Sequence, residues 1–231
     1  MDGTPRILAA GDQAVLIEFG EEIKPAISRR IQAFTQRASQ HRIPGIGELV
    51  PSYCTVLIYY DPSDLSFSQA ASWAGEFLSS GSVEVESTPK IKEVPVLYGG
   101  SSGPDINFVA EHNGISVEEV IRFHTGQTYL VYVVGFSPGF TAMGTVPEKI
   151  QAPRLPTPRT RVPAGSVGIG GVQTGIYPIE SPGGWRLIGR TPLRLFDLNW
   201  TPPSRFQAGD YARFYSIGEE EFREISTSKR A

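Results

Sequence analysis

The first part of the chain alternates short apolar runs with stretches in which apolar residues recur every three or four positions. Residues 5–20 hold two apolar segments around a Gly11-Asp12 turn signal, and this pattern predicts a hairpin or a bulged strand. A helix is predicted from Pro25, because proline at the first helical position removes no helical hydrogen bond. Its apolar face consists of Ile27, Ile31, Phe34 and Ala38.

A strand and a second helix follow. Cys54 to Tyr60 is apolar on both parities, which is typical of a strand covered on both faces. Ser66 and Gln69 form a capping-box pattern at the start of a helix that is expected to end at Gly81, and Val83 to Glu86 begins another strand. The helix carries its apolar residues on one stripe: Phe67, Ala70, Ala71, Ala74, Phe77 and Leu78.

The β-α-β-α-β order of these elements predicts a small α+β domain over residues 1–88. Thr88-Pro89 is the predicted boundary, so the second domain covers residues 89–231. There, Ile91 to Tyr98 alternates like a strand. Further elements are predicted at Pro104–Glu111 (helix), Ser116–His124 (helix with a Ser116/Glu119 capping box) and Gln127–Phe136 (strand), and the tail holds one strand, YARFYSI, and a short polar end.

The stretch from Gly135 to Phe196 is rich in glycine and proline, which exclude a helix of ordinary length after about residue 138. It contains short runs of strand length, namely SVGIGGVQ, TGIYPIE, GWRLIG and LRLFD, separated by turn signals. Glu180 is the one acid between Lys149 and Phe196, against seven bases: Lys149, Arg154, Arg159, Arg161, Arg186, Arg190 and Arg194. Such arginines on a β scaffold suit anion binding, and a solvated basic face is the open alternative.

The composition narrows the class of protein. The formal net charge of -3 argues against general nucleic-acid binding, and no apolar run reaches the length of a membrane span. The N-terminus lacks the layout of a signal peptide, so we expect a soluble cytoplasmic protein. The single cysteine, Cys54, excludes an internal disulfide, and three scattered histidines offer no metal-ligand spacing.

The segment Gly135-Phe136-Ser137-Pro138-Gly139 matches the G-x-S-x-G pattern of a serine hydrolase. An oxyanion hole needs the N–H of the residue after the serine, and Pro138 has none. All three histidines also precede the serine, against the order of that fold. We therefore interpret Ser137 as a turn residue.

The glycines Gly168, Gly170 and Gly171 lie in a cluster that lacks the lysine of a Walker loop and the third glycine of a dinucleotide motif. Their backbone amides could nest an anion, and they are the candidate cofactor-binding residues. Tight turns in a barrel are the alternative.

The remaining candidate residues are polar side chains around this stretch. His124 ends a capped helix and could act as an acid or cap the helix, and with Arg154 and Arg159 it forms the candidate catalytic set. The candidate substrate-binding residues are Gln173, Thr174, Tyr177 and Arg190.

The run VPAGSVGIGGVQTGIYPIESPGGWRLIGRTPLRLFD, with GFSPGF upstream and His124 before it, closely resembles the family called allophanate hydrolase subunit 1. That family includes the B subunit of 5-oxoprolinase and the kinase inhibitor KipI. The resemblance implies a small α/β N-terminal domain followed by a cyclophilin-like β-barrel. One departure is that the family usually carries P-Y-L-G-G after PGF, where this chain has Thr141 to Thr145.

The resemblance also implies a function. The first expectation is a subunit of an ATP-dependent 5-oxoprolinase that converts 5-oxo-L-proline to L-glutamate. Its implied partners are an allophanate hydrolase subunit 2 type protein and the LamB/YcsF-type A subunit of 5-oxoprolinase, with an ATP site shared with a partner. The alternatives are half of a biotin-dependent urea carboxylase-like carboxyltransferase, or a KipI-like protein that inhibits a sensor histidine kinase without catalysis. No nucleic-acid or membrane partner is expected.

Overall fold

The computed structural model describes residues 4–79 and 90–228. The chain divides into two compact units, Met1–Thr88 and Pro89–Ala231. The domain boundary predicted at Thr88-Pro89, the helix end predicted at Gly81 and the strand predicted at Val83–Glu86 lie outside the described residues. No helix within the described ranges has the length and apolar character needed to cross a membrane.

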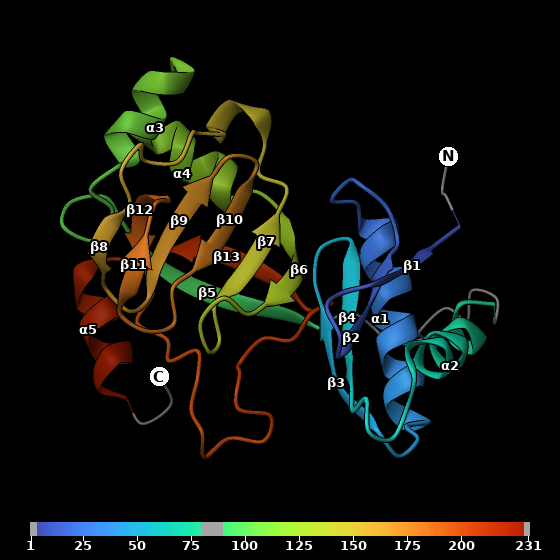
Figure 1. Cartoon of the computed structure of the whole chain (residues 1–231). Helices are drawn as coiled ribbons and strands as arrows, with labels where there is room; N and C mark the ends of the chain where they lie inside the picture. The colour runs from blue at the N-terminus through green and yellow to red at the C-terminus, as the bar shows by residue number, and fades with distance from the viewer. Residues whose placement is uncertain (1–3, 80–89, 229–231) are drawn as a thin grey trace. The chain divides into compact units, whose positions relative to one another are not determined.

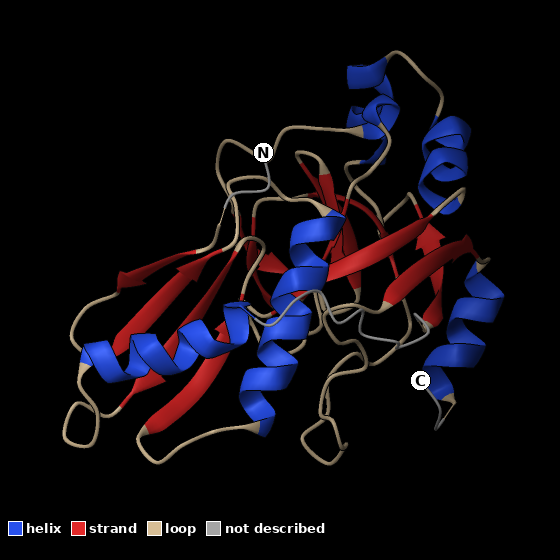
Figure 2. Cartoon of the chain, turned by 90° about the vertical axis from the view of Figure 1, so that its right-hand side faces the viewer, coloured by secondary structure: helices blue, strands red, loops and turns tan. Residues whose placement is uncertain are grey.

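The first unit is an antiparallel four-stranded sheet with two helices. The strands are β1 (Arg6–Ala9), β2 (Ala14–Glu18), β3 (Ile46–Pro51) and β4 (Thr55–Tyr60), in the spatial order β1-β2-β4-β3. Helices α1 (Pro25–Gln40) and α2 (Phe67–Ser79) pack on this sheet, as Figure 2 shows. Their shared core contains side chains from both helices and from all three strands β2, β3 and β4.

Most of the predicted elements of this unit are confirmed. The hairpin forms around Gly11, helix α1 begins at Pro25, and its four predicted apolar residues are buried. The predicted capping box also forms, with Ser66 N–H donating to Gln69 Oε1 at 2.8 Å. The prediction that the Cys54–Tyr60 strand is covered on both faces was wrong, because burial alternates along β4 and Tyr59 is 46% exposed. Strand β3 was not predicted.

The second unit is built on a closed barrel with the strand order β10-β7-β6-β13-β5-β12-β9 (Figure 1). Strands β5 and β13 pair in parallel, and every other barrel pair is antiparallel. The barrel strands are β5 (Ile91–Tyr98), β6 (Thr128–Val134), β7 (Thr141–Gly144), β9 (Ser166–Gly170), β10 (Gln173–Ile176), β12 (Arg186–Arg190) and β13 (Tyr211–Ser216).

A two-stranded sheet and several helical segments complete this unit. The sheet pairs β8 (Arg159–Val162) with β11 (Ser181–Gly183). Helices α3 (Ile106–Asn113) and α4 (Val117–Thr125) lie together at one end of the barrel in Figure 1. A 3₁₀ turn, η1 (Glu148–Ile150), packs near them, and α5 (Glu219–Thr227) follows β13.

The predicted strand at Ile91–Tyr98 and both predicted short helices are confirmed, including the Ser116/Glu119 capping box. The predicted strand LRLFD was wrong, since residues 193–197 form a braced loop with one isolated bridge between Phe196 and Ser204. The tail predicted as a short polar end forms helix α5 instead. None of the residues of α5 is fully buried, and its apolar face consists only of Phe222 and Ile225, which is a short stripe for identifying a packed helix from the sequence.

Candidate functional site

The glycine-rich strands β9 and β10 provide a bed for one large aromatic side chain, Trp185. A Cβ atom added at Gly170 would lie 2.7 Å from the Trp185 indole, and one at Gly175 would lie 3.0 Å from it. A Cβ at Gly168 would lie 3.1 Å from Trp185 Cβ. Only glycine therefore lets the indole lie this close to the outer face of the barrel.

The packing of Trp185 on these glycines argues against the cofactor-binding role predicted for Gly168, Gly170 and Gly171. The first two belong to a paired strand beneath Trp185. Gly171 has φ 65° at the β9–β10 turn, and its N–H already donates to the Ala152 carbonyl at 2.8 Å. An anion nest needs free amides. The structure thus favours the alternative, tight barrel turns and close packing, and these residues do not fit a bound nucleotide.

Tyr177 lies just after β10 on the same outer face and is 2% exposed. Its ring meets Phe140 edge-on at 5.1 Å between centroids, and Phe140 meets Trp185 at 5.6 Å. Burial raises the pKa of the Tyr177 phenol, while the Trp185 backbone and the charges of Arg154 and Arg159 act in the opposite direction. Both arginines therefore lie within electrostatic reach of this phenol.

Arg159 begins strand β8 and is held by a buried carboxylate. Its Nη2 lies 2.8 Å from Asp105 Oδ1, and the other Asp105 oxygen accepts the Leu187 N–H at 2.7 Å. Asp105 is 8% exposed, so this pair fixes the direction of the guanidinium. The second terminal nitrogen of Arg159, Nη1, is buried without a hydrogen-bond partner. Its hydrogen-bonding capacity is therefore unused in this structure.

Arg154 is exposed, and its guanidinium lies 5.6 Å from the centre of the Trp185 ring. Within the described residues no carboxylate forms an ion pair with it. Stacking on the indole orients the cation without neutralising it. We call Arg154, Arg159, Tyr177, Trp185 and Phe140 the arginine–aromatic cluster. Two guanidinium groups beside an aromatic wall can bind a carboxylate or phosphate.

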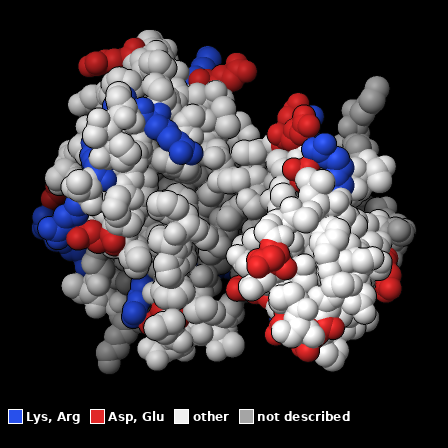
Figure 3. Space-filling model, in the orientation of Figure 1, with Lys and Arg blue, Asp and Glu red and all other residues white. Residues whose placement is uncertain are grey.

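The seven basic residues counted in the sequence do not act as one surface. Figure 3 shows the Lys and Arg side chains of the barrel in separate groups. Arg161 pairs with Glu180 at 2.6 Å, and Arg186 lies 3.5 Å above the Phe108 ring while donating to the Pro153 carbonyl. Arg190, a predicted substrate-binding residue, donates from Nε to the Ala164 carbonyl at 2.8 Å and braces that turn.

His124 lies in the barrel core at 0% exposure, with both ring nitrogens in hydrogen bonds. Nδ1 lies 2.7 Å from the Tyr98 hydroxyl, and Nε2 lies 2.9 Å from Thr174 Oγ1, which donates to the Gly168 carbonyl. This order assigns Nε2–H as the donor to Thr174 and the neutral imidazole as the stable form. Burial lowers the pKa of His124 to about 3. The contacts favour a structural role over the predicted catalytic one.

Gln173 and Thr174 point to opposite faces of β10. Thr174 is 0% exposed and serves the His124 network, so no substrate-binding function follows from its surroundings. Gln173 lies on the outer face, where its Nε2 is buried without a partner, and its register partner Gly170 lies beneath Trp185. Of the predicted substrate residues, Gln173 and Tyr177 thus border the Trp185 face.

The rejection of a serine nucleophile agrees with the geometry of the turn. Ser137 Oγ is buried and has no hydrogen-bond partner, so no base activates it in this structure. Among the described residues, no three His, Cys, Asp or Glu side chains are grouped to hold a metal ion. Local sequence patterns carry no signal for Asp105, because its role depends on pairing with a strand far along the chain.

Comparison with known proteins now adds the family. The carboxyltransferase domain, subdomain C and D, matches residues 5–206. The chain belongs to this family. It is 41% identical over 222 residues to the 5-oxoprolinase B subunit of Bacillus subtilis, and the alignment covers 92% of each chain. The resemblance drawn from the glycine-rich run is therefore confirmed.

Two solved structures are similar in fold to the chain. The protein TTHA0988 shares 34% identity with a TM-score of 0.79 over 89% of this chain, which spans only 40% of that longer polypeptide. Kluyveromyces lactis urea carboxylase shares 24% identity with a TM-score of 0.75, covering 95% of this chain and 22% of that one. These likenesses confirm the predicted α+β class with a β-barrel.

Proposed function

We propose that this chain is the B subunit of an ATP-dependent 5-oxoprolinase, which converts 5-oxo-L-proline to L-glutamate. The observation that carries the proposal is the identity with the Bacillus subtilis 5-oxoprolinase B subunit along nearly the whole length of both chains. The proposed reaction is cytoplasmic. The proposed partners are an allophanate hydrolase subunit 2 type protein and the LamB/YcsF-type A subunit of the enzyme.

The chemistry explains why ATP and arginines belong together. A lactam carbonyl is a poor electrophile, and transfer of the ATP γ-phosphoryl group to its oxygen gives ADP and an activated ring. One water then opens the ring C–N bond to an acyl phosphate, and a second releases phosphate and glutamate. Charge grows on phosphoryl oxygens in these steps, and fixed guanidinium groups stabilise such charge.

Within this scheme we assign an anion-binding role to Arg154 and Arg159. Arg159 is oriented by Asp105 and retains an unpaired Nη1, and Arg154 is exposed on the indole of Trp185. The anion is the carboxylate of 5-oxoproline or the transferred phosphoryl group. We assign no proton transfer to His124 and place no nucleotide at Gly168, Gly170 or Gly171. The partner subunits complete the ATP site.

The test is co-expression with the proposed partners followed by an assay of 5-oxoproline-dependent ATP hydrolysis. We expect activity from the assembled complex and none from the isolated chain. A second candidate is a carboxyltransferase half acting on a urea-like amide, which the name of the family favours. Carboxyl transfer from carboxybiotin to urea, without 5-oxoproline-dependent ATP hydrolysis, would establish that alternative instead.

A further inference from the structure

Two neighbouring loops of the second unit each present a large apolar side chain to solvent. Phe136, in the turn between β6 and β7, is 83% exposed, and Leu198, in the loop after β12, is also 83% exposed. No other large hydrophobic side chain in the described residues is as exposed. The loops touch, because a Cβ added at Gly139 would lie 2.8 Å from Phe196 Cβ.

Phe136 is held outward by a backbone that does not favour it. Its φ is 77°, and it is the one non-glycine residue with positive φ in the described part of the chain. Bulky residues rarely adopt this conformation, which costs free energy. The turn is closed by Gly135 N–H to Phe140 O and by Phe140 N–H to Ser137 O, each at 2.9 Å. This conformation is not explained by burial of the Phe136 ring, which is exposed and contacts the ring of Phe140 edge-on.

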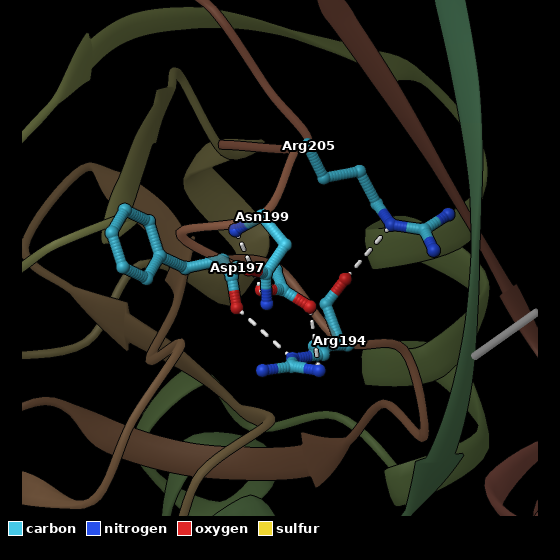
Figure 4. Close-up of polar contacts among 5 residues, drawn as sticks. Arg194, Asp197, Asn199 and Arg205 are labelled. Carbon is cyan, nitrogen blue, oxygen red and sulfur yellow. Dashed lines mark hydrogen bonds and ion pairs between the residues drawn. The ribbon is translucent and has the colours of Figure 1, made fainter. Parts of the chain in front are cut away.

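The second loop, residues 194–205, descends from the barrel in Figure 1 and is braced from within. Figure 4 shows that Asp197 accepts from Arg194 Nη1 at 2.7 Å and from Asn199 N and Nδ2 at 2.9 and 3.0 Å. Arg205 Nε donates to the Arg194 carbonyl at 2.9 Å. Leu198 lies between two members of this network. It is therefore presented on a preorganised loop, which lowers the ordering cost of binding.

We propose that Phe136 and Leu198 form a docking surface for the polypeptide that longer relatives carry in the same chain. This chain spans 40% of TTHA0988, so that protein joins the same fold to a further polypeptide. A relative covered almost completely is named a subunit, which fits a partner that is encoded separately here. This inference rests on the proposed function in that one respect.

The surface also indicates the chemistry of its partner. An exposed aromatic ring on a fixed turn supplies an anchor that can fill a pocket on the partner, and Leu198 adds exposed apolar area on the neighbouring loop. Arg194, on the same loop as Leu198, has a side chain that is 60% exposed, and its charge is already paired with Asp197 at 2.7 Å. The matching surface on the partner is therefore an apolar pocket.

The test uses the full chain and, as the probe, the separately encoded homologue of the TTHA0988 segment that this chain does not cover. Dissociation constants are measured by calorimetry for the wild type, Phe136→Asp, Leu198→Asp and Phe136→Gly. We expect each substitution to weaken binding by at least about 30-fold. Phe136→Gly keeps or raises the melting temperature, because glycine accepts positive φ. The matched controls are Val172→Asp and Ile179→Asp, which are 43% and 41% exposed on the same unit and are expected to bind like the wild type.

Three outcomes overturn the inference. They are wild-type affinity in the Phe136 and Leu198 variants, equal weakening by the two controls, and no binding of the probe to the wild-type chain. Self-association of the isolated chain that the same substitutions abolish would assign the surface to a second copy instead. Activity is assayed separately on the same complex. Specific binding without 5-oxoproline-dependent ATP hydrolysis supports the docking surface and contradicts the proposed function.

Discussion

At the scale of single residues, His124 shows how burial decides the role of a side chain. Its imidazole is neutral in the folded chain, since burial lowers its pKa from 6.5 to about 3. In the unfolded chain it takes up a proton near its ordinary pKa, so the unfolded state binds more protons between these values. The stability that depends on neutral His124 is complete above about pH 6.5 and falls progressively toward pH 3.

This linkage predicts a difference between the wild type and His124→Gln. Between pH 6 and pH 4 we expect the free energy of unfolding of the wild type to fall more steeply, by up to about 1.4 kcal/mol per pH unit. Denaturant unfolding at several pH values measures the slopes. An NMR titration of the wild-type imidazole gives an independent check. Equal slopes, or protonation of His124 near pH 6.5 in the folded chain, would contradict the assignment.

The arginines of the cluster carry the second prediction at this scale. Arg154→Lys and Arg159→Lys keep the charge and lose the planar fork of the guanidinium. We therefore expect each to lower kcat/KM of the assembled complex by an amount that corresponds to about 1.5–3 kcal/mol of transition-state binding. A rise in KM for 5-oxoproline would locate the substrate carboxylate there, and a rise in KM for ATP would locate the phosphoryl group.

Arg213→Lys is the matched control for these variants. Arg213 is half-exposed on β13, and its guanidinium lies 3.7 Å from the Glu93 carboxylate. Such an exposed ion pair contributes little free energy, so we expect the change in kcat/KM to correspond to less than about 0.5 kcal/mol. Arg186, which strand parity would suggest as a control, is unsuitable because it packs on Phe108. Wild-type kinetics and melting temperatures in both cluster variants would contradict the anion-binding role, and the arginines would then form a solvated basic surface.

The sequence predicted some of these residues and could not predict others. Arg154, Arg159 and Tyr177 were singled out and lie near one another. Asp105, which orients Arg159, lies 54 residues earlier in the chain, and only the barrel pairing brings the two together. Arg190 carries the same charge as the cluster arginines, but its Nε donates to the Ala164 carbonyl, and charge alone does not distinguish these situations.

At the scale of elements, the packing of Trp185 on the glycines of β9 and β10 can be tested by substitution. Gly170→Ala places a Cβ 2.7 Å from the Trp185 indole, so we expect a loss of about 1–3 kcal/mol in the free energy of unfolding. The indole must also move, which a shift in tryptophan fluorescence reports. Gly75→Ala in helix α2 is the control. Its added Cβ meets only Ile7 at 3.9 Å, and the better helix propensity of alanine predicts a neutral or stabilising change.

Unchanged stability and fluorescence in Gly170→Ala would mean that Trp185 does not need the glycine bed. The role of these glycines could not be predicted from the sequence, because tight barrel turns and anion-binding nests both require glycine. The helices and hairpin that were predicted correctly have local signals, such as Pro25 and the Ser66/Gln69 box. The segment LRLFD has a strand-like pattern, yet internal bonds such as Arg194 to Asp197 hold it as a loop.

At the scale of the whole molecule, the fold supplies a barrel face with cations and two braced loops, and the serine of its G-x-S-x-G motif, Ser137, has no base to activate it. The longer relative TTHA0988 carries further polypeptide beside the same fold. These features support a subunit that contributes binding groups to a site completed by other chains. The division of labour between polypeptides could not be predicted from local sequence patterns, and it came from the family resemblance alone.

The most direct measurement is therefore a reconstitution in which phosphate and glutamate are both quantified. The complete complex is compared with this chain alone and with the partners alone, with 5-oxoproline present or omitted. We predict that only the complete complex turns over, and that it releases one phosphate for each glutamate formed. Turnover by this chain alone, or equal turnover by the partners without it, would contradict the proposed role as one subunit of a 5-oxoprolinase.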